Sequence, residues 1–312
     1  MDKTPVLEVC NLSVSFTQYA RGLRKRNLQV ISDLSVKLYG NEIVAVAGAS
    51  GSGKSLLAHA ILGILPYNAR MEGNIYYQGE PLTHERIEQL RGKEISLIPQ
   101  NVSYLDPLMK TGKQARNGIN DRTAREKTRA ILSHFGLDPE IENLYPFELS
   151  GGMARRVLIS TAVMAESKVI IADEPTPGLH MSAAKQVMKH FREFANKGAA
   201  VLLITHDLEL AVEVADRVVV FYGGLTIEEA KSSDFQDVSR LRHPYTKALW
   251  HAMPKNGFRA AEGINPYVNA KLTGCNFVNI CSSAREQCSG YIPYRKMNGG
   301  FVRCIREARN DT

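Results

Sequence analysis

The chain has 312 residues, of which 44% are hydrophobic and 23% charged, and it carries a formal net charge of +7. These proportions are typical of a soluble globular protein, and the length allows one large domain or one domain plus an appendage. No window approaches the roughly 20 apolar residues of a bilayer span, and the polar start at 1–5 lacks the apolar core of a signal peptide. We therefore expect a cytosolic chain without membrane-spanning segments.

Strands are predicted where apolar residues alternate with polar ones or run without interruption. They fall at 7–16, 34–38, 42–47, 74–77, 95–98, 168–172, 199–204 and 217–221. The first two alternate with period two and should be half-exposed antiparallel strands, whereas 42–47 should be fully buried.

Helices are predicted at 55–64, 122–135, 152–165 and 181–196, and the strand signal vanishes from about 101 to 166. The pattern predicts an α/β fold with an antiparallel β subdomain and a helical insert. After Phe235 the pattern degrades into Pro-, Gly- and Cys-rich sequence. We therefore expect one domain over 1–235, with the helical subdomain at about 101–166, and an extension over 236–312.

Residues 48–55 have the spacing of a phosphate-binding loop between a buried strand and a helix. Backbone amides and the positive end of the helix can hold the β- and γ-phosphates of a nucleotide. Lys54 would neutralise the terminal phosphates, and Ser55 would ligate Mg²⁺. We expect the nucleotide to be held by Gly48, Ser50, Gly51, Ser52, Gly53, Lys54, Ser55 and Leu56.

Polar side chains at the ends of three other strands complete the predicted ATP site. Asp173 would hold Mg²⁺, and Glu174 would orient or deprotonate the attacking water. His206 should contact the γ-phosphate, and Gln100 should reach Mg²⁺ or the water. The simpler alternatives are that Asp173 and Glu174 form an acidic helix cap, that His206 is structural and that Gln100 is an ordinary loop residue. Lys54, Gln100, Glu174 and His206 are the predicted catalytic residues.

The segment 149–152 opens a helix, with Ser150 as its cap and with exposed amides at Gly151 and Gly152. It is either an ordinary helix cap or a second phosphate-binding surface. A second surface far from the phosphate loop could not serve the same nucleotide, so it would imply a partner chain.

Over nearly its whole length the chain resembles the nucleotide-binding subunits of ABC transporters, which share a P-loop, RecA-like domain. The matching motifs are the Walker A loop (48–55), the Q-loop (Gln100), the signature (Ser150, Gly151, Gly152), the Walker B pair (Asp173, Glu174) and the switch histidine (His206). Phe16, or Tyr19, falls where that family stacks an aromatic ring on adenine. The resemblance implies that two subunits close around two ATP molecules, each Walker face meeting the signature of the other subunit.

A narrower resemblance, to the oligopeptide, dipeptide and nickel importer branch, rests on Met153, the segment 243–249 and the tail 274–304. It implies a peripheral subunit at the cytoplasmic face of the cell membrane that energises uptake. The implied partners are a related, non-identical ATPase, two membrane permeases and, indirectly, an extracytoplasmic substrate-binding protein; no nucleic acid is expected. The unusual stretch 100–108 favours nickel or a metallophore as cargo.

Four of the five cysteines, Cys275, Cys281, Cys288 and Cys304, have the spacing C-x5-C-x6-C-x15-C. In a cytosolic chain such a group favours a metal over disulfides. Four thiolates suit a [4Fe–4S] cluster, which some members of the branch hold, or Zn²⁺. The absence of a tight C-x2-C pair makes zinc the weaker alternative, and plain reduced thiols are the third.

Two other functions stay open at this point. His180 stands where the family has an aspartate that links the two active sites, which is compatible with a regulatory, low-activity paralogue. The pI of about 9.1 is compatible with a soluble ABC ATPase that acts on nucleic acid. Against this second alternative, such proteins usually carry two cassettes or long coiled-coil or zinc insertions, and this chain has one cassette.

Overall fold

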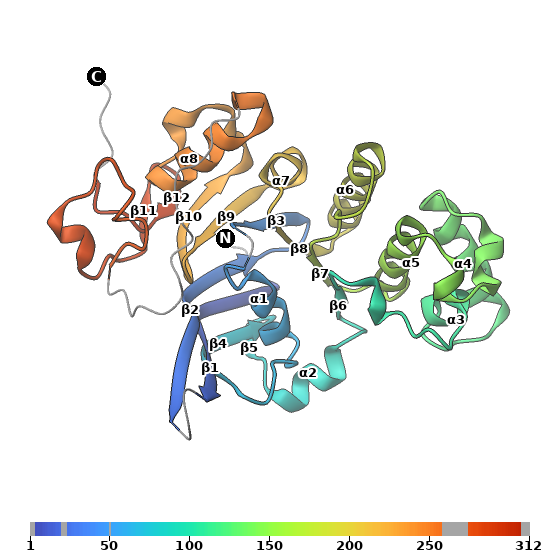
Figure 1. Ribbon diagram of the computed structural model, residues 1–312. Coiled ribbons are helices and arrows are strands. Elements are labelled where there is room, and N and C mark those ends of the chain that lie inside the picture. Colours follow the sequence, from blue (N-terminus) through green and yellow to red (C-terminus); the bar gives the residue numbers. More distant parts are fainter. Residues whose placement is uncertain (1–3, 20–23, 50, 258–273, 307–312) are drawn as a thin grey trace.

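The computed structural model describes residues 4–19, 24–49, 51–257 and 274–306 (Figure 1). Its strands are β1 (Leu7–Tyr19), β2 (Lys25–Leu38), β3 (Glu42–Ala47), β4 (Ala69–Tyr77), β5 (Glu80–Pro81), β6 (Ile95–Ile98), β7 (Val169–Asp173), β8 (Ala200–Thr205), β9 (Arg217–Tyr222), β10 (Leu225–Lys231), β11 (Arg295–Met297) and β12 (Gly300–Val302).

The α-helices are α1 (Lys54–Ile61), α2 (His84–Leu90), α3 (Thr111–Ala115), α4 (Arg122–His134), α5 (Gly151–Met164), α6 (Met181–Asn196), α7 (Leu208–Val214) and α8 (Pro244–Ala252). Short 3₁₀ turns are η1 (Val102–Tyr104), η2 (Pro139–Asn143), η3 (Pro146–Glu148), η4 (Ser232–Gln236), η5 (Val238–Arg240), η6 (Pro254–Asn256) and η7 (Glu286–Ser289). No helix in the described part of the chain is long and apolar enough to cross a bilayer.

The strands form one mixed sheet with the order β5-β4-β1-β2-β10-β9-β3-β8-β7-β6. Strands β9, β3, β8, β7 and β6 run parallel to one another. At the other end, β1 pairs antiparallel with both β2 and β4. The predicted α/β fold with an antiparallel part is confirmed.

The parallel strands are apolar throughout because both of their faces are covered. In β3, Ile43 and Ala45 belong to a core that also holds side chains of α5, α6 and α7. Val44 and Val46 belong to a second core on the opposite face, together with Leu57 of α1. Consecutive residues of one strand thus serve different cores.

Between β6 and β7 the described chain forms only helices and turns, from Val102 to Met164. Glu142 is buried between two guanidinium groups, with Oε2 2.9 Å from Arg116 Nη1 and Oε1 2.6 Å from Arg129 Nη2. This ion pair joins η2 to α4 and to the end of α3. Figure 1 shows these helices at one end of the molecule.

The described residues after 235 pack back onto the sheet, near the opposite end of the molecule (Figure 1). Strand β12 pairs antiparallel with β10. Arg303 is buried and its Nη2 lies 2.7 Å from Asp33 Oδ2 in β2. The extension therefore shares the sheet of the preceding residues.

The sequence pattern does not predict β10, and the structure gives the reason. Glu228 lies inside this strand and is fully buried, and it accepts hydrogen bonds from the backbone amides of Arg242 at 2.8 Å and His243 at 2.7 Å. A buried carboxylate with such partners breaks the apolar pattern without breaking the strand. Strand β2 also starts at Lys25, earlier than predicted; the pattern does not predict its first part because residues 25–33 are largely polar.

Candidate nucleotide site and thiol pocket

The loop between β3 and α1 lies against neighbouring strands. A Cβ atom at Gly48 would lie 2.2 Å from the Phe221 carbonyl oxygen. Gly53 has φ +94°, and a Cβ there would lie 2.8 Å from Val30 Cγ1. Both positions therefore require glycine. Ser50 of the predicted phosphate-binding set lies outside the described residues.

The Lys54 ammonium lies inside this loop. Its Nζ donates hydrogen bonds to the carbonyl oxygens of Gly48 and Ala49, both at 2.8 Å. Burial lowers the pKa of Lys54, while the nearby Glu174 and Asp173 carboxylates act in the opposite direction. The loop thus holds a buried positive charge at the start of α1, where helix polarity also favours an anion.

Asp173 ends β7 and is 4% exposed. The Ser55 hydroxyl hydrogen-bonds to its carboxylate, but Oδ1 is buried without a hydrogen-bond partner among the described residues. Burial raises the pKa of Asp173. An unpartnered carboxylate oxygen next to a serine hydroxyl is a donor set that suits Mg²⁺, so these residues fit the predicted ion.

Glu174 and His206 lie together at the adjoining strand ends. His206 Nδ1 is 2.8 Å from Glu174 Oε2. Glu174 is 7% exposed and has φ +46°, a conformation that a non-glycine residue rarely adopts. The hydrogen bond from its amide to the Ile204 carbonyl, 2.8 Å long, holds this backbone in place. The structure thus brings the two predicted catalytic side chains into contact.

Arg155 is a site residue that the sequence analysis missed. It is 3% exposed, and its Nη1 donates to the Pro99 carbonyl at 2.7 Å while its Nη2 donates to the Glu174 carbonyl. One guanidinium group on α5 therefore holds both the segment before Gln100 and the backbone of Glu174. Its helical spacing from Gly151 and Leu158, on one face of α5, was the available signal.

The remaining predicted residues of the ATP site make fewer contacts. Gln100 is exposed two residues beyond Ile98, which pairs with Ala172 of β7. Phe16 is half-buried in β1 opposite Leu28, and Tyr19 is 69% exposed. Leu56 is partly buried in α1 against the second core. Nothing in these contacts assigns either aromatic ring to adenine.

The segment 149–152 begins α5 as predicted. The Ser150 hydroxyl accepts a hydrogen bond from the Met153 amide at 3.3 Å and caps the helix. Gly151 is exposed, and a Cβ atom there would have no neighbour within 4 Å. The start of α5 is therefore open to solvent and free to meet another molecule.

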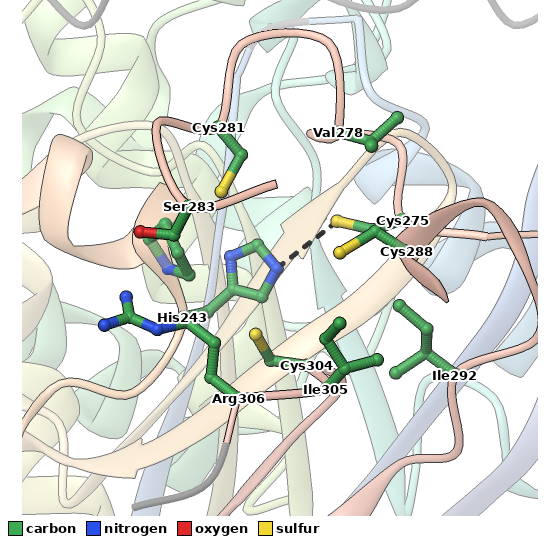
Figure 2. A pocket seen from close by; sticks show the side chains of 11 residues that line it. His243, Cys275, Val278, Cys281, Ser283, Cys288, Ile292, Cys304, Ile305 and Arg306 are labelled. Carbon is green, nitrogen blue, oxygen red and sulfur yellow. Dashed lines mark hydrogen bonds between the residues drawn. The ribbon is translucent and has the colours of Figure 1, made fainter. Parts of the chain in front are cut away.

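The four C-terminal cysteines line one small pocket, and Figure 2 shows their sulfur atoms around the ring of His243. All four are free thiols; Cys288 and Cys304 are buried, and the other two are half-buried. The Cys275 sulfur lies 3.6 Å from His243 Nε2. The Cys275 amide donates to the Cys288 carbonyl at 2.8 Å, which brings these two distant parts of the chain together.

The donor set of this pocket fits a metal centre. Burial raises the pKa of the Cys275 thiol to about 11 and also raises that of Cys304, so a cation would relieve the cost of forming thiolates there. Among the described residues no three of these thiols lie mutually within 4.8 Å. A zinc ion with Zn–S bonds of about 2.3 Å needs its sulfurs closer than that.

Tyr245 connects this pocket to the phosphate loop. Its ring lies 4.1 Å from the Tyr222 ring and 5.5 Å from the Phe277 ring, measured between centroids. The Ala49 amide of the phosphate loop hydrogen-bonds to the Tyr245 hydroxyl. The sequence alone assigns no role to Tyr245, which lies in the segment 243–249, because the contact joins residues almost two hundred positions apart.

Comparisons with known proteins identify the family. The model of the ABC transporter family matches residues 31–177, and that of the oligopeptide/dipeptide transporter C-terminal region matches 227–288. The dipeptide transport ATP-binding protein DppD of Bacillus subtilis is 33% identical over 92% of this chain and 90% of its own length. The chain belongs to the ATP-binding subunits of ABC transporters.

Another relative in this family is the oligopeptide transport ATP-binding protein OppF of Haemophilus influenzae, which is 33% identical over 98% of both chains. A solved ATP-binding subunit of an ABC transporter superposes with a TM-score of 0.62 at 26% identity, covering 74% of this chain and 92% of the other. A dimeric bacterial ABC cassette gives 0.64 at 22% identity, over 72% and 98%, and supports the fold alone.

This ABC ATPase is therefore an enzyme that binds and hydrolyses ATP, with Mg²⁺ as the usual companion ion of the nucleotide. The predictions of family, fold and ATPase activity are confirmed. The alternative of an ABC protein that acts on nucleic acid loses its support. The relatives that align with nearly the whole chain are named as transport proteins.

Proposed function

We propose that this ABC ATPase energises the import of dipeptides or oligopeptides across the cytoplasmic membrane, from its cytoplasmic face. The observation that carries the proposal is the match of residues 227–288 to the C-terminal region of oligopeptide/dipeptide transporters. Relatives named for dipeptide and oligopeptide transport align over nearly the whole chain. Nickel or a metal chelate is the alternative cargo, and only the unusual stretch 100–108 favours it.

We infer the catalytic roles of these residues as follows. The phosphate loop, with Lys54, would bind and neutralise the terminal phosphates. Ser55, Asp173 and Gln100 would hold Mg²⁺, which would supply charge neutralisation on the phosphates. Glu174 orients or deprotonates the attacking water, and His206, 2.8 Å from its carboxylate, fixes its position and contacts the γ-phosphate.

The partner of this site is a second, related ATPase that forms a heterodimer with this chain. The exposed Ser150–Gly152 segment supports this proposal, since open amides at a helix start can bind the γ-phosphate in the partner's site. The helical region exposes large apolar side chains that suit docking to two membrane permeases. They are Tyr104 (59% exposed), Leu108 (86%), Ile119 (56%) and Phe147 (72%).

The four thiols are proposed to hold a [4Fe–4S] cluster, with zinc and unmetallated thiols as the alternatives. Cys275, Cys281, Cys288 and Cys304 would be the ligands, and the cluster would supply a redox-active or structural centre. Anaerobic purification should give a coloured protein with about four iron atoms per chain. Cys281→Ser should lose the colour and Cys10→Ser should keep it. A colourless, iron-free wild type would refute the cluster.

The transport proposal is tested by tagging this chain in its host and purifying it from detergent-solubilised membranes. We expect a second ABC ATPase and two permeases in the complex, and loss of dipeptide or oligopeptide uptake when Glu174→Gln replaces the wild type. Unchanged peptide uptake with lost nickel uptake would contradict the peptide proposal. Absence of any permease would contradict the transport role.

A further inference from the structure

Two histidines and a glutamate meet where the helical region contacts the rest of the molecule, away from both sites described above. His134 is the last residue of α4, which belongs to the helical region between β6 and β7. His190 and Glu193 lie one turn apart on α6, the helix that follows β7. The three side chains therefore join two parts of the protein that are distant in sequence.

The three ligand atoms are already in a compact arrangement. His134 Nε2 lies 3.0 Å from Glu193 Oε2, and His190 Nδ1 lies 3.4 Å from the same oxygen. All three atoms lie within 4.8 Å of one another. A tetrahedral ion with bonds of about 2.0–2.1 Å separates its ligand atoms by about 3.3–3.4 Å. The distances from Glu193 Oε2 to His134 Nε2 and to His190 Nδ1 are thus close to the separation that such an ion requires.

The surroundings suit a metal ion that enters from solvent. His190 is 5% exposed, and the Phe135 ring packs on it with centroids 4.4 Å apart. The side chains of His134 and Glu193 are 48% and 44% exposed, which leaves a path to water and room for a water ligand. The inner wall is thus buried and packed against an aromatic ring, and the outer side is open.

We propose that His134, His190 and Glu193 form a binding site for one divalent transition-metal ion. Two imidazoles and one carboxylate, with water as a further ligand, form a set that Zn²⁺ accepts and that also suits Ni²⁺ or Co²⁺. The bound ion joins the end of α4 to α6 and restrains the helical region against the sheet. Without a metal, the same groups form a His–Glu–His hydrogen-bonded network.

The test compares zinc binding by four full-length chains stripped of metal: wild type, His134→Ala, Glu193→Gln and His84→Ala. His84 is the matched control, because it is an exposed histidine with one carboxylate neighbour, Glu88 at 3.6 Å, and belongs to no three-ligand group among the described residues. Competition with a chromogenic chelator counts the bound zinc. Zinc taken up by the cysteines is common to all four chains and cancels in the comparison.

We expect wild type and His84→Ala to bind one zinc equivalent beyond any held by the cysteines. His134→Ala and Glu193→Gln should lose this zinc or bind it at least about 10-fold more weakly. Zinc should also slow hydrogen exchange at the end of α4 in wild type but not in Glu193→Gln. Circular dichroism and ATP binding should be unchanged, since His134 and Glu193 lie outside the nucleotide site. Equal zinc stoichiometry and affinity in all four chains would overturn the proposal.

Discussion

At the scale of single residues, the nucleotide site holds charges that would be unfavourable in an ordinary protein interior. Lys54 and Asp173 are almost fully buried, and Asp173 keeps an oxygen without a hydrogen-bond partner in the described structure. Glu174 adopts a rare backbone conformation. Such features cost stability, and they persist where a bound ligand makes use of them.

The unpartnered oxygen of Asp173 leads to a prediction. Asp173→Asn removes a buried carboxylate whose Oδ1 has no hydrogen-bond partner among the described residues, so the nucleotide-free protein should keep its melting temperature or gain about 2 °C. The stabilisation by Mg²⁺-ATP should disappear, because the ion loses its ligand. Thermal melts with and without Mg²⁺-ATP check both effects. A lower melting temperature with an intact nucleotide effect would contradict this role.

Arg155 gives a second prediction at this scale. Arg155→Met should destabilise the protein by about 2–4 kcal/mol, because it leaves the buried carbonyls of Pro99 and Glu174 without their donor. Arg122→Met is the matched control, since this side chain is 92% exposed and the substitution should change stability by less than about 0.5 kcal/mol. Urea unfolding measures both variants; similar values for the two would refute the bridging role.

At the scale of elements, α6 begins without a side-chain cap. His180 has the extended conformation of an N-cap residue but makes no capping hydrogen bond. Aspartate, the residue found here in the family that the chain resembles, caps helices well and carries a favourable charge at a helix start. The first turn of α6 is therefore less stable than it would be with aspartate at position 180.

His180→Asp should accordingly stabilise the protein by about 1 kcal/mol, whereas His180→Ala should be nearly neutral. Chemical denaturation of the three proteins gives the comparison. Equal stability of the aspartate and alanine variants would show that this helix start gains nothing from a cap.

The same variants test the alternative of a low-activity subunit. If His180 weakens the linkage of the two ATP sites, the aspartate variant should hydrolyse ATP faster than wild type in the assembled complex.

Sequence reasoning succeeded for elements with a simple pattern and failed where long-range contacts decide. The apolar runs at 42–47 and 95–98 gave β3 and β6 with their observed bounds, because both strands are buried on both faces. Strand β10 was missed because Glu228 is stabilised by residues beyond the strand. Arg155 and Tyr245 were missed for a similar reason, since their partners lie far away in the chain.

At the scale of the whole molecule, the C-terminal residues contact both the sheet and the phosphate loop. Two contacts connect the thiol pocket to the phosphate loop. His243 Nδ1 accepts a hydrogen bond from the Tyr245 amide at 3.0 Å, and the Tyr245 hydroxyl contacts the Ala49 amide. The C-terminal region therefore reaches the phosphate loop through Tyr245.

Tyr245→Phe should weaken Mg²⁺-ATP binding by about 2- to 12-fold, the value of one hydrogen bond, while the ring packing keeps the fold intact. Tyr294→Phe is the matched control, because its hydroxyl is buried without a hydrogen-bond partner among the described residues. Fluorescent-nucleotide titration compares the variants. Equal affinities for both would show that the loop does not depend on this contact.

The central claim is that Asp173, Glu174 and His206, together with the phosphate loop, form a competent ATP-hydrolysing site in this ABC subunit. The most direct measurement is ATP turnover by the purified complex that contains either the wild-type chain or Glu174→Gln, with nucleotide binding measured in parallel. We predict that the turnover due to this chain's site falls at least about 100-fold while ATP affinity is retained. Turnover that Glu174→Gln leaves unchanged would contradict the claim.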